Sequence, residues 1–366
     1  MPKQKVNPRL TKIESKSPIK GISEVLYLSE KYPDRKALEA DTDFWDASTA
    51  GQYSWCPRNA QYSRRMGLVQ RDEALTLLTG NAIHAGADVL HASGDEDLAV
   101  EVVVKTFGDR EPPAPSHPYA HLHTGFVEAV FKNYLEWRKK HETFVPLVVQ
   151  YDDLDLTDVV AAILRVFPSG RVILGESKLV MRFDVDGQEL LYSGKPDLPI
   201  QMGQRLYIQD WKVSCGGYLS DWYFEKHVVS NQLRGYLAML TTLLGRRFEG
   251  AYIGGIYVGE HALETHTKAG KPSTITKFAP YGPLLFKSDH LEEALWNQYA
   301  WRQMAFAYQD LAKQHPYMYK RFGYPQNTGK SCQGCSFLPL CKAQPKARRA
   351  VIAQKYVQRQ RKFLDL

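Results

Sequence analysis

Alternating apolar and polar residues predict β-structure in the middle of the chain. Residues 171–194, RVILGESKLVMRFDVDGQELLYSG, alternate on both sides of Asp186-Gly187, a dipeptide that favours a two-residue hairpin turn. Met202-Gly203 is a second predicted turn, and we expect it to join two antiparallel strands that start near Leu190 and near Leu206. This region is therefore expected to supply the central strands of a sheet.

Apolar residues at helical spacing predict helices on both sides of these strands. Leu75, Leu78, Ala82 and Gly86 form one stripe within a helix expected at residues 71–91. Such a mixture of helices and strands predicts an α/β fold, with a mixed sheet core and flanking helices. The other expected helices are 22–31 (short), 119–140, 228–245 and 288–314, and the other expected strands are 98–106 and 251–260.

The length and composition are those of a soluble globular protein. The 366 residues can bury a sizeable core, and 44% hydrophobic and 24% charged residues are ordinary values for this class. No apolar run is long enough to span a bilayer, and no apolar segment follows the basic residues at the N-terminus. We therefore expect a cytoplasmic protein that makes no membrane contact.

Positive charge is concentrated at the two ends of the chain. Residues 1–20 contain six Lys or Arg and one Glu, and residues 342–366 contain eight Lys or Arg and one Asp. The formal net charge is only +7, so the region between these ends is net acidic. Basic ends favour contact with a polyanion such as the backbone of a nucleic acid. The alternative interpretation is a pair of solvated tails that aid solubility.

Two acidic residues and a lysine are the first candidates for chemistry. Asp197 and Asp210 lie on the strands that flank Met202-Gly203, and Lys212 lies two residues after Asp210. Because successive side chains on a strand alternate between faces, Asp210 and Lys212 are expected on the same face. Two converging carboxylates beside an ammonium group suit a hard cation with an activated water. The alternative interpretation is a solvated surface hairpin.

Four of the five cysteines form a second candidate site. Cys332, Cys335 and Cys341 have the spacing C-x2-C-x5-C, and Cys56 lies far upstream. Thiolates are soft ligands that suit an iron–sulfur cluster or zinc, but a zinc ribbon usually has two CxxC knuckles and this chain has one. Disulfides are rare in the cytoplasm. Cys215 stands apart and is expected to be a bystander thiol.

The order of these motifs resembles a known family. Lys195-Pro196-Asp197 followed by Asp210-Trp211-Lys212 is similar to the signature of the PD-(D/E)XK nuclease superfamily. Gln232 and Tyr236 resemble the QxxxY motif of its RecB-like branch, and His84, four residues after Gly80, resembles the histidine of a GxxxH helix in that branch. The resemblance implies a restriction-endonuclease-like mixed sheet flanked by helices.

The resemblance also implies roles for individual residues in metal-dependent phosphodiester hydrolysis. Asp197 and Asp210 would hold Mg²⁺ or Mn²⁺, with His84 as a further ligand. Glu176, on the strand before the motif, is another candidate ligand, although an exposed carboxylate on a strand face is the plain alternative. Lys212 would orient the attacking water. Gln232 and Tyr236 would position the strand that is cut.

The cysteine pattern resembles the iron–sulfur members of that branch, which include the AddB-type helicase-nuclease subunit and the CRISPR-associated iron–sulfur exonucleases. There, a 4Fe–4S cluster held by the counterparts of Cys56, Cys332, Cys335 and Cys341 clamps the ends of the nuclease domain together. The implied organisation is a basic N-terminal extension (1–45), a nuclease domain (46–341) with a helical insert (92–170), and a basic C-terminal tail (342–366).

This resemblance implies an exonuclease that acts on single-stranded DNA ends in recombination, repair or CRISPR-type processing. Because the chain contains no GxxxxGK[ST] motif, a helicase or recombination protein is an expected partner. A bacterial or phage-infected cell, with a phage gene as one origin, fits such a system. The alternative function is a non-catalytic DNA-binding subunit of a larger recombination complex, stabilised by an iron–sulfur cluster or zinc.

Overall fold

A computed structural model gives the fold. It describes residues 10–12, 17, 19, 21–28, 30, 32, 37, 45–70, 75–266, 271–326, 332 and 335–358. Most of the basic segment 1–20, the first four residues of the helix expected at 71–91, and residues 359–366 of the basic C-terminal tail lie outside the described residues.

The first sheet is antiparallel and has the strand order β1-β2-β6-β7-β5, with β8 paired to β7. The expected hairpin at Asp186-Gly187 is confirmed, because both residues have positive φ, 53° and 73°, as a tight turn between β7 and β8 requires. The short helix expected at 22–31 is wrong, since residues 23–28 form β2 beside β6. The strands are β1 Leu10–Lys12, β2 Ser23–Leu28, β5 Val148–Gln150, β6 Val159–Val166, β7 Arg171–Val185 and β8 Gln188–Gly194.

The second sheet is mixed, with the order β12-β11-β10-β9-β4. The turn at Met202-Gly203 joins β9 to β10 as expected. The strand expected from Leu190 is in fact two strands, because Lys195-Pro196-Asp197 carries the chain from β8 in one sheet to β9 in the other. The strands are β4 Val145–Pro146, β9 Leu198–Met202, β10 Arg205–Ser214, β11 Phe248–Tyr257 and β12 Phe278–Leu285.

Strands β10 and β11 pair in parallel, so the chain must cross from the end of one strand to the start of the other. Helix α8, Asn231–Leu244, makes this crossover and packs against β11. Ser230 caps its first turn, and Gly245 ends it in the left-handed conformation. The expected helix at 228–245 is therefore confirmed within three residues at its start.

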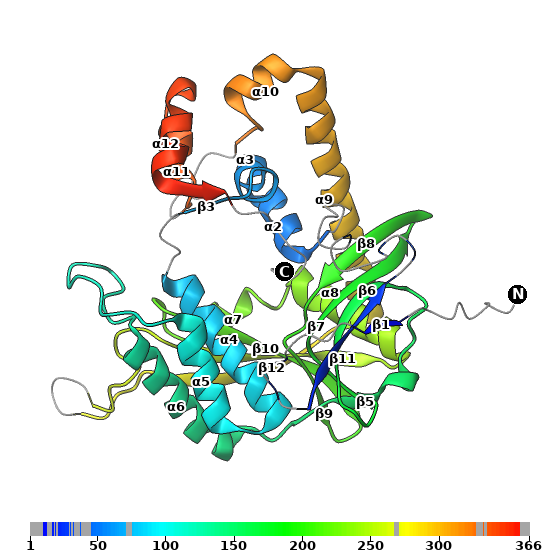
Figure 1. Ribbon diagram of the computed structural model, residues 1–366, viewed down its shortest axis with the longest axis vertical. Helices are drawn as coiled ribbons and strands as arrows, with labels where there is room; N and C mark the ends of the chain where they lie inside the picture. The colour runs from blue at the N-terminus through cyan, green and yellow to red at the C-terminus, as the bar shows by residue number, and fades with distance from the viewer. Residues whose placement is uncertain are drawn as a thin grey trace, which may run out of the picture.

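Three helices within residues 75–141 pack side by side (Figure 1). They are α4 Leu75–Ser93, α5 Glu96–Phe107 and α6 Thr124–His141. The strand expected at 98–106 is wrong, because this segment is α5. Asp95 caps it by accepting a 2.9 Å hydrogen bond from the backbone N–H of Leu98. Its buried side chains, Ala99, Val103 and Phe107, repeat every fourth residue and outweigh the β-propensity of its valines.

Gly86 allows these helices to approach closely. A Cβ at this position would lie 2.3 Å from Val103 Cγ2 on α5 and 2.8 Å from the Phe131 ring on α6. At Gly80, six residues earlier, a Cβ would meet nothing within 4 Å. Only the second of the two glycines in α4 is therefore required by packing.

The C-terminal part of the chain returns to the N-terminal part. The long helix expected at 288–314 is confirmed as α9, and it packs against α8 and α2 (Figure 1). Strand β13 pairs with β3, which joins residues 356–358 to residues 68–70. A small core of Tyr62, Leu68, Phe337, Leu340 and Tyr356 lies beside this two-stranded sheet.

The remaining elements complete the helical layers around the two sheets. They are α2 Ala47–Trp55, α3 Pro57–Ala60, a π-helical turn Gln61–Arg65, β3 Leu68–Gln70, a 3₁₀ turn Tyr151–Asp153, α7 Asp221–Glu225, α9 Ser288–Gln314, α10 Pro316–Phe322, α11 Leu338–Lys342, a 3₁₀ turn Pro345–Ala347, α12 Arg348–Lys355 and β13 Tyr356–Gln358. Among the described residues, no helix combines the length and the apolar character that crossing a membrane requires. The expected α/β fold, with a sheet core and flanking helices, is confirmed.

The packing around Gly86 gives a test of the fold. We expect Gly86→Ala to lower the free energy of unfolding by about 1–3 kcal/mol, since the added methyl overpacks the contact with Val103 and Phe131. Gly80→Ala is the matched control, and it should leave stability unchanged or raise it by up to about 1 kcal/mol through helix propensity. Urea unfolding followed by circular dichroism measures both, and equal stability of the two variants would contradict the packing described.

Candidate metal centre

The candidate site forms where the chain leaves the first sheet and joins the second. Strand β8 ends at Gly194 and β9 begins at Leu198, so Asp197 lies at the junction. Its Oδ2 accepts a 2.8 Å hydrogen bond from the backbone N–H of Trp211 on β10. This bond fixes the Asp197 carboxylate against the strand that carries the other two motif residues.

Glu176 reaches the same junction through a bulge in β7. The pairing of β7 with β6 changes register between Ile163 and Arg165, and Glu176 adopts a φ of 55°. Its backbone N–H donates to the carbonyl oxygens of Pro196 and Asp197, at 2.9 Å and 3.1 Å. The left-handed backbone is unfavourable for glutamate, and these two bonds hold it in place. The sequence placed Glu176 on a strand but gave no sign of this bulge.

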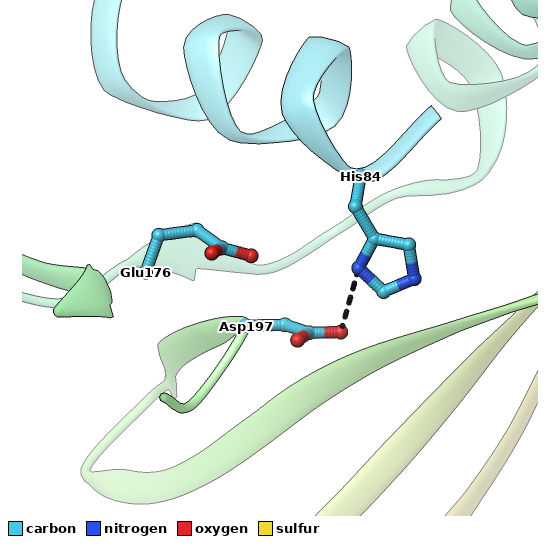
Figure 2. A group of neighbouring side chains, drawn as sticks. All are labelled: His84, Glu176 and Asp197. Atoms are coloured by element: carbon cyan, nitrogen blue, oxygen red, sulfur yellow. Dashed lines mark ion pairs between the residues drawn. The ribbon is translucent and has the colours of Figure 1, made fainter. Parts of the chain in front are cut away.

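His84 approaches from α4 on the other side of the junction. Figure 2 shows its ring pointing at Asp197, with the Glu176 carboxylate turned towards the same space. His84 Nδ1 lies 3.4 Å from Asp197 Oδ2, and one ligand atom from each of the three residues falls within 4.8 Å of the others. A histidine and two carboxylates at this spacing can hold a divalent cation.

Asp210 and Lys212 lie beside this group on β10. Asp210 is completely buried, and Lys212 Nζ forms an ion pair with its Oδ2, so the two side chains share a face as expected. Asp210 does not join His84, Glu176 and Asp197 in the set of ligand atoms within 4.8 Å. Its Oδ1 has no hydrogen-bond partner in the part of the chain that the structure describes. A buried carboxylate oxygen without a donor is suited to a cation.

The electrostatics of the junction also favour a cation. Burial, followed by the nearby Asp210 carboxylate, raises the pKa of Asp197 to about 7. Burial raises the pKa of Glu176 to about 7 as well, against the opposing effect of Lys195. Burial lowers the pKa of His84, so its ring is neutral and can act as a ligand. The residues present therefore fit a divalent metal ion.

Two lysines partly neutralise the junction. For Lys212, burial disfavours the charged form, but the Asp210 and Asp197 carboxylates outweigh burial and raise its pKa. Lys195 forms an ion pair with Glu176 and has a raised pKa for the same kind of reason. The sequence interpretation gave Lys195 no role. Its only signal was its place two residues before Asp197.

Gln232 and Tyr236 stand one turn apart on α8, next to the junction. Gln232 Nε2 donates a 3.0 Å hydrogen bond to Tyr236 Oη. The Tyr236 ring packs so closely on Gly194 that a Cβ there would lie 2.8 Å from Tyr236 Cε1. This contact ties α8 to the end of β8, directly before the residues that turn into the site.

Comparison with known protein families identifies the chain: the model of the PD-(D/E)XK nuclease superfamily matches residues 45–342. The chain belongs to the PD-(D/E)XK nuclease superfamily. No curated protein gives a significant match to it. The mixed second sheet with flanking helices is consistent with the restriction-endonuclease-like fold of this superfamily.

Four of the five cysteines of this nuclease-superfamily chain form a separate group, which brings the N-terminal Cys56 next to three cysteines of the C-terminal part. Cys56, Cys332, Cys335 and Cys341 line one cavity together with Trp55 and Phe337. Asn59 Nδ2 donates to Cys335 Sγ at 3.5 Å. Cys215 lies elsewhere, buried in the main core, and burial raises its pKa to about 11.

The raised pKa of Asp197 predicts how stability depends on pH. The folded protein holds this proton up to about pH 7, whereas the unfolded chain releases it near its ordinary value of 3.8, so metal-free stability falls as pH rises through this window. We expect the melting temperature of the metal-free protein to drop from about pH 5 to about pH 8, and to drop less in Asp197→Asn.

Mn²⁺ should reverse this loss, because binding displaces the protons. We expect Mn²⁺ to raise the melting temperature of the wild-type protein more at high pH than at low pH, and to have little effect on Asp197→Asn. Differential scanning fluorimetry with and without Mn²⁺ measures both effects. The same pH profile for the two proteins would show that Asp197 does not carry the raised pKa.

Proposed function

We propose that this chain is a metal-dependent DNA exonuclease of the RecB-like branch that acts on single-stranded ends. The observation that carries the proposal is the convergence of His84, Glu176 and Asp197 beside the Asp210–Lys212 pair. Superfamily membership supports nuclease chemistry. In the branch that these motifs resemble, a histidine in this position marks exonucleases.

Each residue has a role that its chemistry supports. Asp197 and Asp210 would hold Mg²⁺ or Mn²⁺, with His84 and Glu176 as further ligands. A divalent ion, when bound, lowers the pKa of a water ligand and neutralises charge on the phosphate. Lys212 stays protonated at neutral pH, so it donates hydrogen bonds to the water and the phosphate rather than accepting a proton. Gln232 and Tyr236 position the strand.

We also propose that Cys56, Cys332, Cys335 and Cys341 hold a 4Fe–4S cluster. All four line one cavity, which supports a shared inorganic group. A zinc ribbon usually has two CxxC knuckles, whereas this chain has one, at Cys332 and Cys335. This cysteine pattern supports a cluster over zinc.

The cluster would clamp the two ends of the domain. Linking residues 56 and 332 closes a loop whose entropy in the unfolded chain corresponds to about 5–6 kcal/mol. The clamp and the basic ends of the chain would favour threading of a free DNA end. A helicase or recombination protein remains the proposed partner, and bacterial or phage DNA processing the proposed setting.

Exonuclease action predicts a dependence on DNA ends. With Mg²⁺ or Mn²⁺, we expect rapid degradation of linear single-stranded DNA and little or no cutting of covalently closed single-stranded circles at equal nucleotide concentration. Gel analysis of both substrates measures this. Lys212→Met should lower the rate by about 100-fold or more but retain DNA binding, because many phosphate contacts contribute to binding.

The control for Lys212→Met is Lys132→Met, which removes a surface lysine paired with Glu128 far from the junction in sequence. It should leave the rate unchanged, since exposed ion pairs contribute little. Equal rates on linear and circular DNA would indicate an endonuclease. Normal cleavage by Lys212→Met would place the active site elsewhere.

The cluster proposal predicts which thiols matter. We expect Cys56→Ala and Cys332→Ala to lose iron and most of the thermal stability, whereas Cys215→Ala keeps both because it lies outside the cavity. Iron analysis, visible absorption and thermal melts of protein purified without oxygen measure these effects. A colourless wild-type protein containing zinc, or loss of iron from Cys215→Ala alone, would refute the ligand set.

A further inference from the structure

A second cavity lies beside the site, between α2, the start of α8 and α9. Its volume is about 270 Å³, and its lining includes Gly51, Ser54, Ser230, Asn231, Gln232 and Gln298. We call this cavity the α2–α8 cradle. Helix α2 contacts both α8 and α9, which hold its walls together. Its polar lining groups are hydroxyls, amides and the backbone of a helix start.

Gln298 places a hydrogen-bond donor in the cradle. Its side chain on α9 is completely buried, and its Oε1 accepts a 3.1 Å hydrogen bond from Trp45 Nε1. An indole N–H can only donate, so the oxygen of the Gln298 amide faces Trp45 and its nitrogen Nε2 is left to find another acceptor. This Nε2 has no hydrogen-bond partner among the described residues. Because Gln298 lines the cradle, an acceptor bound there would satisfy this nitrogen.

The start of α8 adds a second preference for an acceptor, specifically an anion. Asn231 begins this 14-residue helix, and Ser230 caps it by accepting from the backbone N–H of Leu233 at 3.4 Å. First-turn N–H groups of a helix have no partner within it, and the helix dipole favours negative charge there. The described residues that line the cradle include no Lys or Arg, so these neutral donors define its chemistry.

Gly51 keeps the cradle open. A Cβ at this position on α2 would meet nothing within 4 Å, so the space above it is free. The neighbouring lining residues on α2 are also small, namely Ala47 and Ser54. A larger side chain at position 51 can therefore fill the cradle without disturbing the packing of α2.

Gln232 links the cradle to the metal centre. It lines the cradle, and its Nε2 donates to Tyr236, which packs against Gly194 directly before Lys195. Burial raises the pKa of Tyr236, and the Asp197 and Asp210 carboxylates lie close enough to contribute to this rise. The cradle and the metal centre are therefore neighbours connected through Gln232 and Tyr236.

From these observations we propose that the α2–α8 cradle binds one non-scissile phosphate of the substrate strand. Gln298 Nε2 and the first-turn N–H groups of α8 donate to its oxygens. The site positions the strand beside the metal centre. The proposal deepens the proposed function and rests on it for the identity of the strand.

Binding of modified oligonucleotides tests the cradle independently of catalysis. Single-stranded oligonucleotides carry one neutral methylphosphonate at each position in turn, and fluorescence anisotropy measures binding to protein with the Lys212→Met change. We expect one position at which neutralisation weakens binding by about tenfold, the effect of losing hydrogen bonds to a charged group. Adding Gly51→Leu should abolish that position's effect, because the filled cradle no longer holds the phosphate.

Two further variants separate the cradle from general damage. Gly51→Ala is the matched control, and it should keep the position-specific effect because a methyl group leaves the space open. Gln298→Glu keeps an acceptor for Trp45 but turns a carboxylate oxygen into the cradle, so it should weaken binding of unmodified DNA and remove the same position's effect. Thermal melts check that both variants are folded.

The outcomes distinguish this proposal from the proposed function. Scans that are identical in the Gly51→Leu and Gly51→Ala proteins would overturn the cradle. The cradle would also be overturned if Gly51→Leu removed the effect of an abasic nucleotide but not the effect of a methylphosphonate, since a base would then be the occupant. Degradation of linear single-stranded DNA with Mn²⁺ by the protein that retains Lys212 tests the proposed function separately. Its absence, with the methylphosphonate effect intact, would refute nuclease activity and leave the cradle standing.

Discussion

Three carboxylates buried together at the junction between the sheets set the main constraint on this molecule. Glu176, Asp197 and Asp210 would each be ionised in water at neutral pH, but burial and mutual repulsion hold protons on Glu176 and Asp197 up to about pH 7. Lys195 and Lys212 offset part of the repulsion through ion pairs. The arrangement is costly for the folded protein alone and becomes favourable when a divalent cation supplies the missing positive charge.

The surrounding fold can be understood as the support for this junction. The bulge in β7 turns Glu176 inward, and the N–H of Trp211 fixes Asp197. Gly86 lets α5 and α6 pack tightly on α4. This helix also carries His84, whose Nδ1 lies 3.4 Å from Asp197 Oδ2. His84, Glu176 and Asp210 come from α4, β7 and β10, and Asp197 comes from the connection between β8 and β9, so the site forms only when both sheets and α4 are assembled. Rigid helices and strands hold ligands more accurately than loops, and the hydrogen bond from Trp211 fixes Asp197 to β10.

Helix α8 contributes both to the second sheet and to the α2–α8 cradle. It makes the crossover that lets β10 and β11 pair in parallel, and its first turn faces the α2–α8 cradle. At the C-terminal end of α2, Trp55 and Cys56 line the cysteine cavity, and α3 follows directly. Phe337, which also lines this cavity, packs with Leu340 and Tyr62 in a small apolar core. The C-terminal segment is thus held to residues 62–70 by β3–β13 pairing and apolar contact, and a bound cluster would add to this contact.

The sequence alone determined the features that depend on neighbouring residues. Hairpin turns at Asp186-Gly187 and Met202-Gly203, the helices α4, α8 and α9, and the shared face of Asp210 and Lys212 follow from local turn chemistry and periodicity. Local rules failed at α5, whose valines indicated a strand, because capping by Asp95 and a four-residue apolar repeat decided the helix. They also failed at residues 23–28, which are a strand because β6 offers an edge to pair with.

Only the tertiary structure decided how the candidate site is assembled. No local pattern shows that β8 and β9 belong to different sheets, that β7 bulges at Glu176, or that Lys195 pairs with it. These features arise from the pairing of segments distant in the chain, and the same is true of Gln298, whose oxygen accepts from Trp45 while its nitrogen has no partner among the described residues. Sequence motifs could name the acidic residues and the lysine, but their separation, burial and pKa values depend on which elements meet at the junction.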